Sequence, residues 1–311
     1  MKLGIVRVAA AVILRADGAV LLAQRPAGKP YAGYWEFPGG KLEPGESPRQ
    51  ALDRELREEL GLSVVRAAPW LVQDFVYPHA RVELHFFRVF EFAGEPIGHD
   101  GQAFAWQRPD AIDVKPLLPA NTRVLAALAL PPVLGITCAS DLGEDAFLAR
   151  AEVALRAGLR LVQVREKTWP AARLEAFVAR FAALASASGA AWVLNGSEVD
   201  ARRFGAAGVH WTAAALAAAR SRPAGLIVGA SCHRRDDLAR AADLGVDYAV
   251  LGPVLPTPTH RDAVALGWAG FEREALGARL PVYALGGLRR SDLDMAIDRG
   301  AHGVALRSGA W

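Results

Sequence analysis

Three closely spaced glutamates are the side chains of this 311-residue sequence best suited to chemistry. Glu55, Glu58 and Glu59 are spaced i, i+3 and i+4, so on a helix they share one face. Like charges at this spacing repel and cost roughly 0.2–0.5 kcal/mol per pair. A hard divalent cation with oxygen ligands would remove that cost, and Mg²⁺ is the usual choice beside phosphates. The alternative is a solvated acidic face, interleaved with Arg54 and Arg57.

A loop followed by a helix is expected to position these glutamates. Residues 39–45 contain three glycines and a proline, which should exclude regular structure before Ser47. Ser47 and Gln50 have the spacing of a capping box, and Gly61 is placed to end the helix. Between them, three leucines recur every four residues as a core stripe. They are Leu52, Leu56 and Leu60.

The stretch from Gly40 to Leu62 also matches a longer pattern. It reads GKLEPGESPRQALDRELREELGL and fits all nine constrained positions of the Nudix box, G-x5-E-x7-R-E-U-x-E-E-x-G-U, where U is apolar. The chain therefore resembles a Nudix hydrolase over residues 1–130. This resemblance implies an α/β/α sandwich with a mixed sheet, Mg²⁺ (or Mn²⁺) as cofactor, and hydrolysis of a diphosphate bond.

Within that family, the first half is most similar to MutT, a hydrolase of oxidised purine deoxynucleoside triphosphates. The similarity includes the segments WEFPGGKLE, GEPIGHDGQ and LLPAN. It implies 8-oxo-dGTP as the substrate, with a nucleoside monophosphate and pyrophosphate as products. The implied metal ligands are Gly39, Glu55, Glu58, Glu59 and Asp100, with Glu55 also the general base. The implied contacts to the oxidised base are Arg25, Phe37 and Asn121.

Each of these base contacts also has a plain structural explanation. Arg25 is typical of a surface charge after a strand, Phe37 of a core residue and Asn121 of a helix cap. The amide of Asn121 offers both a donor and an acceptor, which suits a purine edge. Such a site rejects a mismatched base because its own polar groups are then left unpaired. Asp100 stands where the family usually has glutamate, which leaves the number of metal ions open.

The rest of the first half predicts short strands and one more helix. A hairpin is expected over Val6–Arg15 and Ala19–Gln24, joined by a turn at Asp17-Gly18. The other expected elements are strands at Tyr34–Phe37, Val64–Asp74, Val82–Glu91 and Phe104–Gln107 and a helix at Leu118–Leu130.

A second domain is expected after Pro131 and Pro132, because a proline pair stops helices and stiffens a linker. Short apolar runs then alternate with alanine-rich helical stretches, which predicts a (β/α)₈ barrel over residues 133–311. The expected strands are Val133–Ile136, Leu161–Val164, Trp192–Leu194, Gly208–His210, Leu226–Gly229, Tyr248–Leu251, Pro281–Ala284 and Gly303–Leu306. No closing helix is expected after the last strand, so the first half or a second copy in a homodimer should cover the apolar flank.

Polar and glycine residues follow these strands, where barrel enzymes place their chemistry. The segments QVREK, SCH and GPVLPTPT together resemble the thiamin phosphate synthase/TenI superfamily. This resemblance implies a pocket for a thiazole or thiamin phosphate, with His233 as the group that transfers protons. The implied ligand contacts are Gln163, Lys167, Asn195, Thr257, Thr259, Gly286, Gly287 and Ser308.

The sequence departs from the synthase pattern at its metal-binding acids. Asn195 is followed by Gly196 and Ser197 instead of Asp-Arg, and no acid follows His210 within the next nine residues. His260 replaces the usual lysine. Those two acids hold Mg²⁺ on the diphosphate leaving group, so synthase activity is not expected. The TenI branch of thiazole tautomerases shares the Asn-Gly pair.

Composition narrows the setting of both halves. A net charge of +3 over 311 residues does not predict a nucleic-acid-binding surface. No apolar run is long enough to span a membrane, and the start lacks a convincing cleavage site. Cys138 and Cys232 are too few for a disulfide framework, which favours the cytoplasm.

Three functions remain open from the sequence. The first is sanitation of oxidised purine triphosphates by the first half. The second is an enzyme of thiamin metabolism that hydrolyses damaged thiamin diphosphate, with tautomerase or synthase activity in the barrel. The third is a non-catalytic barrel that binds a thiamin phosphate and regulates the hydrolase.

Overall fold

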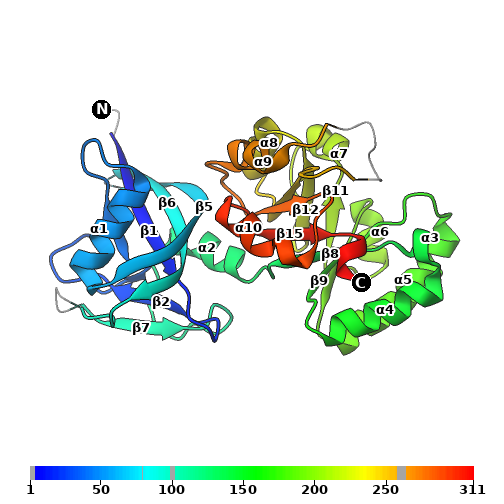
Figure 1. The fold of residues 1–311 in the computed structure, drawn as a ribbon, viewed down its shortest axis with the longest axis horizontal. Coiled ribbons are helices and arrows are strands. Elements are labelled where there is room, and N and C mark those ends of the chain that lie inside the picture. Colours follow the sequence, from blue (N-terminus) through cyan, green and yellow to red (C-terminus); the bar gives the residue numbers. More distant parts are fainter. Residues whose placement is uncertain (1–3, 79, 99–101, 258–263) are drawn as a thin grey trace. The chain divides into compact units, whose positions relative to one another are not determined.

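A computed structural model describes residues 4–78, 80–98, 102–257 and 264–311. The chain divides into two compact units, Met1–Ala129 and Leu130–Trp311, each with its own hydrophobic core (Figure 1). Among the residues described, none of the helices combines the length and the apolar character needed to cross a bilayer.

The first unit contains two small sheets and two helices. A mixed sheet has the strand order β4-β1-β6-β5, and an antiparallel sheet has the order β3-β2-β7. Its elements are β1 (Ile5–Ile13), β2 (Val20–Gln24), β3 (Trp35–Glu36), β4 (Gly39–Lys41), α1 (Pro48–Leu60), β5 (Ser63–Tyr77), β6 (Ala80–Ala93), β7 (Phe104–Gln107) and α2 (Asn121–Leu128).

Strand β1 occupies an inner position of the mixed sheet because both of its faces are apolar. Ala9, Ala11 and Ile13 pack in one cluster with the leucines of α1. Ala10 and Val12, which point to the opposite face, pack with α2. The two helices therefore cover opposite faces of the sheet (Figure 1), which confirms the predicted α/β/α sandwich.

The predicted capping box at the start of α1 is confirmed. The Ser47 side chain accepts a hydrogen bond from the Gln50 backbone, and the Gln50 side chain accepts one from the Ser47 N–H. Gly61 ends the helix in the left-handed conformation, with φ of 67°. The leucine stripe is fully buried, and burying such a side chain contributes roughly 1.5–3 kcal/mol. The helix that carries the glutamates is therefore held firmly in place.

Two predictions for this unit differ from the structure. The expected turn at Asp17-Gly18 forms, with the Arg15 N–H donating to the Ala19 carbonyl at 2.9 Å, but the two strands belong to different sheets and Leu14 to Val20 is an isolated bridge between them. Residues 39–41 form strand β4 although glycine normally disfavours regular structure. A Cβ at Gly39 would lie 2.1 Å from the Ala9 carbonyl oxygen, so the missing side chain is what lets β4 pair with β1.

The second unit is a closed barrel of eight parallel strands, as predicted. The strands are β8 (Val133–Ile136), β9 (Leu161–Val164), β10 (Ala191–Leu194), β11 (Gly208–Trp211), β12 (Ile227–Cys232), β13 (Tyr248–Leu251), β14 (Val282–Leu285) and β15 (Gly303–Leu306). The helices are α3 (Ala139–Leu142), α4 (Glu144–Arg156), α5 (Ala171–Ala187), α6 (Glu198–Arg203), α7 (Ala213–Ala218), α8 (Arg235–Asp243), α9 (Gly267–Ala275) and α10 (Leu293–Asp298), with a 3₁₀ turn, η2 (Arg290–Asp292), before α10.

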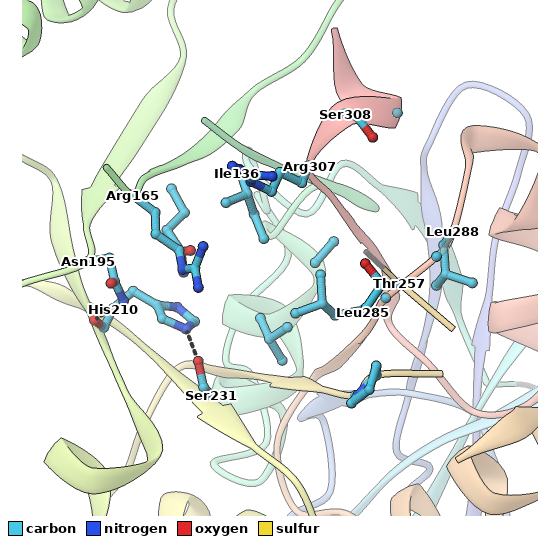
Figure 2. Close-up of a pocket in the computed structure, with 18 of the residues that line it drawn as sticks. Ile136, Arg165, Asn195, His210, Ser231, Thr257, Leu285, Leu288, Arg307 and Ser308 are labelled. Atoms are coloured by element: carbon cyan, nitrogen blue, oxygen red, sulfur yellow. Dashed lines mark hydrogen bonds between the residues drawn. The ribbon is translucent and has the colours of Figure 1, made fainter. Parts of the chain in front are cut away.

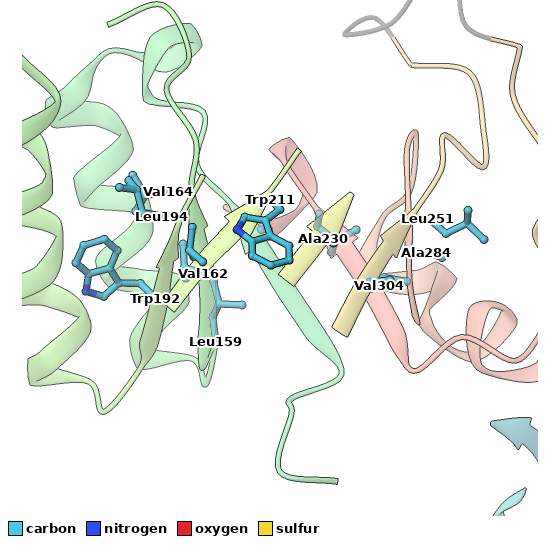
Figure 3. Close-up of a cluster of buried hydrophobic side chains, with 14 of the residues drawn as sticks. Leu159, Val162, Val164, Trp192, Leu194, Trp211, Ala230, Leu251, Ala284 and Val304 are labelled. Atoms are coloured by element: carbon cyan, nitrogen blue, oxygen red, sulfur yellow. The ribbon is translucent and has the colours of Figure 1, made fainter. Parts of the chain in front are cut away.

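The strands of the barrel bury both faces. One set of side chains fills the interior and includes Tyr248 and Tyr283. The other set packs outward against the helices, and Trp192 contacts Phe181 of α5 (Figure 3). Because all strands run parallel, their carboxyl ends meet at one mouth, which is where barrel folds place their ligands.

A 3₁₀ turn, η3 (Ser308–Ala310), follows β15 and leads to Trp311. The indole nitrogen of Trp311 donates to the Ile136 carbonyl at 2.9 Å. Its ring lies 4.8 Å from the ring of Phe147 in α4. Trp311 therefore covers the core between β8 and α4.

Candidate functional site

Helix α1 presents its three glutamates unequally. The side chains of Glu55 and Glu59 are only 15% and 16% exposed, whereas that of Glu58 is 60% exposed. Glu55 and Glu59 are one helical turn apart and form an inner pair of carboxylates. Glu58 lies at the rim, so the three predicted ligands do not have equivalent surroundings.

The glycine loop makes room for one of these carboxylates. A Cβ at Gly40 would lie 2.1 Å from the carboxyl carbon of Glu55, which is less than any real contact. The Gly39 N–H hydrogen-bonds to Glu59. The loop therefore does more than turn the chain, because its bare backbone receives the carboxylates of α1.

Arg54 connects the loop to the acidic face. Its guanidinium donates to Glu46 at 2.9 and 3.0 Å, to Glu55 at 3.0 Å and to Glu58 at 3.1 Å. It also donates to the Lys41 carbonyl at 3.0 Å. These contacts lower the pKa of Glu46 and raise that of Arg54. The interleaved arginine thus neutralises part of the acidic face.

Glu59 carries the clearest electrostatic signal of the unit. Burial, followed by the negative charge of Glu55, raises its pKa to about 7. A pair of partly buried carboxylates that repel each other and offer only hard oxygen donors suits Mg²⁺ or Mn²⁺. The groups that would hold the ion are Glu55 and Glu59, with Glu58 and the Gly39 carbonyl beside them.

This ligand set is only partly assembled in the structure. Among the described residues, no three His, Cys, Asp or Glu side chains converge closely enough to hold a metal ion. Arg54 engages both Glu55 and Glu58, which accounts for part of this. Asp100 lies outside the described residues. The assignment of the metal ligands therefore stays a prediction.

The residues predicted to contact a base are tied into the protein. Arg25 forms a two-point ion pair with Glu36, at 2.5 and 2.7 Å. The Phe37 side chain is buried against Phe86 and offers almost no surface to a ligand in this conformation. Asn121 is not a helix cap, because its amide nitrogen donates to the carbonyl of Trp35 at 3.3 Å.

The sequence did not reveal Glu36, which is the charged partner of Arg25. Burial raises its pKa against the lowering effect of Arg25. The negative charge of Glu36 also raises the pKa of Glu59 and, after burial, that of Tyr77 to about 12. The period of two in a strand could have revealed it, because Glu36 points away from its apolar neighbours in the Trp-Glu-Phe run.

The mouth of the barrel holds a cavity of about 800 Å³. Figure 2 shows Arg165, Asn195 and His210 on one wall, with Thr257 and Ser308 across from them. Thr259 lies outside the described residues. The structure brings together the other predicted residues, which are Gln163, Lys167, Asn195, His233, Thr257, Gly286, Gly287 and Ser308.

The charge of this cavity favours an anion. Four cationic side chains line it, whereas Asp141 is the one acidic residue of the described lining. Asp141 is already paired with Arg307 at 2.6 Å. Burial and then Arg307 lower the pKa of Arg165, which had not been predicted as a site residue. The four cations are Arg165, Lys167, Arg289 and Arg307.

Gly286 and Gly287 lie at the phosphate end expected from the resemblance. Both have positive φ angles, 107° and 68°. A Cβ at Gly287 would also lie 2.7 Å from the Pro256 carbonyl oxygen. Backbone conformation and packing are therefore enough to explain the two glycines. Their amides could in addition bind an anion.

Two histidines have different surroundings in the cavity. His233 places Nδ1 3.0 Å from the Gly252 carbonyl, so Nδ1 carries the proton and Nε2 can accept one. His210 is buried and its pKa is lowered to about 3, with Nε2 3.0 Å from the Ser231 hydroxyl. His233 can therefore accept a proton at Nε2, while His210 stays neutral and orients Ser231.

Metal binding to the first unit should depend on pH. Because the pKa of Glu59 is raised to about 7, this group is mostly protonated at pH 6 and mostly ionised at pH 8. A metal ion must displace the proton, so we expect calorimetry to show about tenfold tighter Mn²⁺ binding at pH 8 than at pH 6. Glu43→Gln, on the exposed loop, should keep this rise. A flat profile in the wild-type protein would contradict the assignment.

A methyl group at position 40 should disturb the site without unfolding the protein. In Gly40→Ala, the new Cβ must push away the end of the Glu55 side chain, which is flexible. We expect Mn²⁺ affinity to fall about tenfold, which corresponds to one lost ligand contact of roughly 1.4 kcal/mol, with a melting temperature within a few degrees of the wild type. Gly4→Ala is the control, because nothing lies within 4 Å of its Cβ. Unchanged Mn²⁺ binding would show that Glu55 is not a ligand.

Two family models match the chain. One, described as NUDIX domain, matches residues 5–128, and the other, described as Thiamine monophosphate synthase, matches residues 133–310.

Individual relatives match one half each. The CTP pyrophosphohydrolase of Escherichia coli is 45% identical over 128 residues, which are 39% of this chain and 90% of that protein. The 8-oxo-dGTP diphosphatase of Haemophilus influenzae is 40% identical over 40% of this chain and 91% of its own length. The thiamine-phosphate synthase of Thioalkalivibrio sulfidiphilus is 36% identical over 52% of this chain and 79% of its own length. The chain therefore combines a Nudix hydrolase domain with a barrel of the thiamine monophosphate synthase/TenI type, and it belongs to both families.

Proposed function

We propose that the Nudix unit hydrolyses nucleoside triphosphates to a monophosphate and pyrophosphate, with 8-oxo-dGTP as its preferred substrate. The observation that carries this proposal is the partly buried carboxylate pair, Glu55 and Glu59, placed against the bare backbone of Gly39 and Gly40. Such a pair is suited to hold a divalent cation beside a phosphate chain.

The residues of α1 would then divide the work. When bound, a divalent ion would neutralise the negative charge on the phosphate oxygens. Glu55 would orient the attacking water and accept its proton, because Arg54 and Gly40 fix its carboxylate. The water oxygen bonds to phosphorus, the bridging P–O bond breaks, and its electrons stay on the departing phosphate.

The choice of base rests on polar groups outside α1. The Asn121 amide is oriented by its bond to Trp35, which leaves its oxygen on the other side of the planar group. Arg25 and Glu36 act as a unit, so a base would meet a paired carboxyl group rather than an isolated cation. The relatives named as 8-oxo-dGTP diphosphatases support the oxidised purine, and the one named as a CTP pyrophosphohydrolase makes CTP the second candidate.

A substrate panel tests this function directly. We expect kcat/KM for 8-oxo-dGTP to exceed that for dGTP, CTP and thiamin diphosphate by at least about tenfold, because a mismatched base leaves buried polar groups unpaired. Released pyrophosphate and phosphate are measured at equal substrate concentrations with Mg²⁺. A preference for CTP would transfer the proposal to the second candidate, and a preference for thiamin diphosphate would support the thiamin pathway.

Two variants establish that the measured hydrolysis comes from this site. Glu55→Gln and Glu58→Gln should each lower kcat by at least about 10²-fold, since removing one electrostatic or proton-transfer group has that effect. Circular dichroism should show an intact fold. Wild-type turnover in either variant would refute the role given to that glutamate.

For the barrel, we propose binding of a phosphate ester, with His233 transferring a proton to or from the bound ring. The observation in favour is the cationic cavity that His233 lines, with Nδ1 placed 3.0 Å from the Gly252 carbonyl so that Nε2 can accept a proton. The described lining lacks a pair of acids to hold Mg²⁺ on a diphosphate, so we expect no synthesis of thiamin phosphate.

Loss of the imidazole should separate proton transfer from binding. In His233→Ala, tautomerisation of a thiazole phosphate should fall at least about 10²-fold while its affinity changes little. NMR detection of deuterium incorporation measures the first and calorimetry the second. Arg234→Ala, which changes the adjacent exposed side chain, is the control. Binding without exchange in the wild type would instead favour the regulatory barrel.

A further inference from the structure

Lys29 lies beside the carboxylates of the Nudix unit, although no sequence motif drew attention to it. Its ammonium nitrogen is 4.0 Å from Oε1 of Glu59. Its positive charge also lowers the pKa of Glu36, on strand β3. Half of the Lys29 side chain remains exposed. A single cation therefore stands between the predicted metal side of the site and the predicted base side, and it is open to solvent.

The loop that carries Lys29 is fixed by its own contacts. Arg25 donates through Nε to the Pro30 carbonyl at 2.7 Å, directly after Lys29. Tyr31 has a φ of 60°, a backbone conformation that tyrosine adopts only when its surroundings hold it there. Its ring packs against Tyr34 at 5.2 Å and Tyr77 at 5.4 Å. The position of Lys29 is thus determined by the loop on both sides.

The neighbouring cations form short contacts with carboxylates, whereas Lys29 makes a longer one. Arg25 forms two short bonds to Glu36, and Arg54 bonds to three glutamates and a carbonyl. Within the described part of the chain, the long contact with Glu59 is the one ion pair that Lys29 makes. A contact of 4.0 Å from a half-exposed ammonium is a weak ion pair, so Lys29 can exchange Glu59 for a stronger anion.

We propose that Lys29 is a positioning residue that binds the terminal phosphate of the substrate and so selects triphosphates over diphosphates. If Glu59 bound a metal ion, the Lys29 ammonium would lose this partner and could bind the phosphate chain, for which lysine is a common partner. No covalent bond to Lys29 forms or breaks. This inference rests on the proposed hydrolysis of nucleoside triphosphates.

The test compares tri- and diphosphates in the full-length protein. Steady-state kinetics with Mg²⁺ are measured for 8-oxo-dGTP, CTP and their diphosphates in the wild type, Lys29→Ala, Lys29→Arg and the control Lys115→Ala, which changes an exposed lysine of the same unit. In Lys29→Ala, KM for the triphosphates should rise about tenfold with kcat nearly unchanged. The reason is that Lys29 would bind the terminal phosphate equally well in the ground state and in the transition state. The diphosphates should be affected less than twofold, and Lys29→Arg should restore most of the loss.

A second measurement excludes a merely structural role. Removing Lys29 frees Glu59 from a competing cation, so Mn²⁺ should bind Lys29→Ala as tightly as the wild type or more tightly. A damaged site would instead weaken both metal and substrate. If the wild type hydrolyses triphosphates but Lys29→Ala keeps its KM for them, or loses tri- and diphosphates alike, the inference is wrong and the proposed function stands. If the wild type hydrolyses no triphosphate, both fail.

Discussion

The close approach of the Glu55 carboxylate to Gly40 is the contact on which the first unit depends. It requires a strand without a side chain at Gly40, and that strand can pair with β1 because Gly39 has no side chain to meet the Ala9 carbonyl. It also requires a helix that cannot retreat, which the buried leucines of α1 provide. The glycine loop and the leucine stripe together hold the Glu55 carboxylate in a partly buried position.

Holding Glu55 and Glu59 close together in a partly buried position is electrostatically unfavourable unless a cation neutralises them. Burial and mutual repulsion raise the pKa of Glu59 to about 7, so the folded protein holds a proton there that the unfolded chain would release. Arg54 compensates Glu55 and Glu58, and Lys29 compensates Glu59 only weakly. A site that keeps one carboxylate poorly neutralised is prepared for a cation that arrives with the ligand.

Local signals in the sequence predicted local structure well. The capping box at Ser47, the end of α1 at Gly61 and the eight barrel strands follow from short-range patterns and agree with the structure. The pairing of β4 with β1 and the separation of the expected hairpin into two sheets depend on contacts between distant residues, which periodicity does not encode. Lys29 was missed for the same reason, because its partner Glu59 lies on a helix that is distant in the sequence.

The two units present opposite charges to a phosphate group. The Nudix unit presents the carboxylates of α1 on one side of its site, so a divalent cation would have to join them to a phosphate chain, while Lys29 is the proposed direct contact with the terminal phosphate. The barrel lines its cavity with arginine and lysine and with the bare amides of Gly286 and Gly287, so it can attract a phosphate directly. In the described lining of that cavity, four cations face a single acid that is already paired with Arg307, which suits the cavity to retain a phosphate ester.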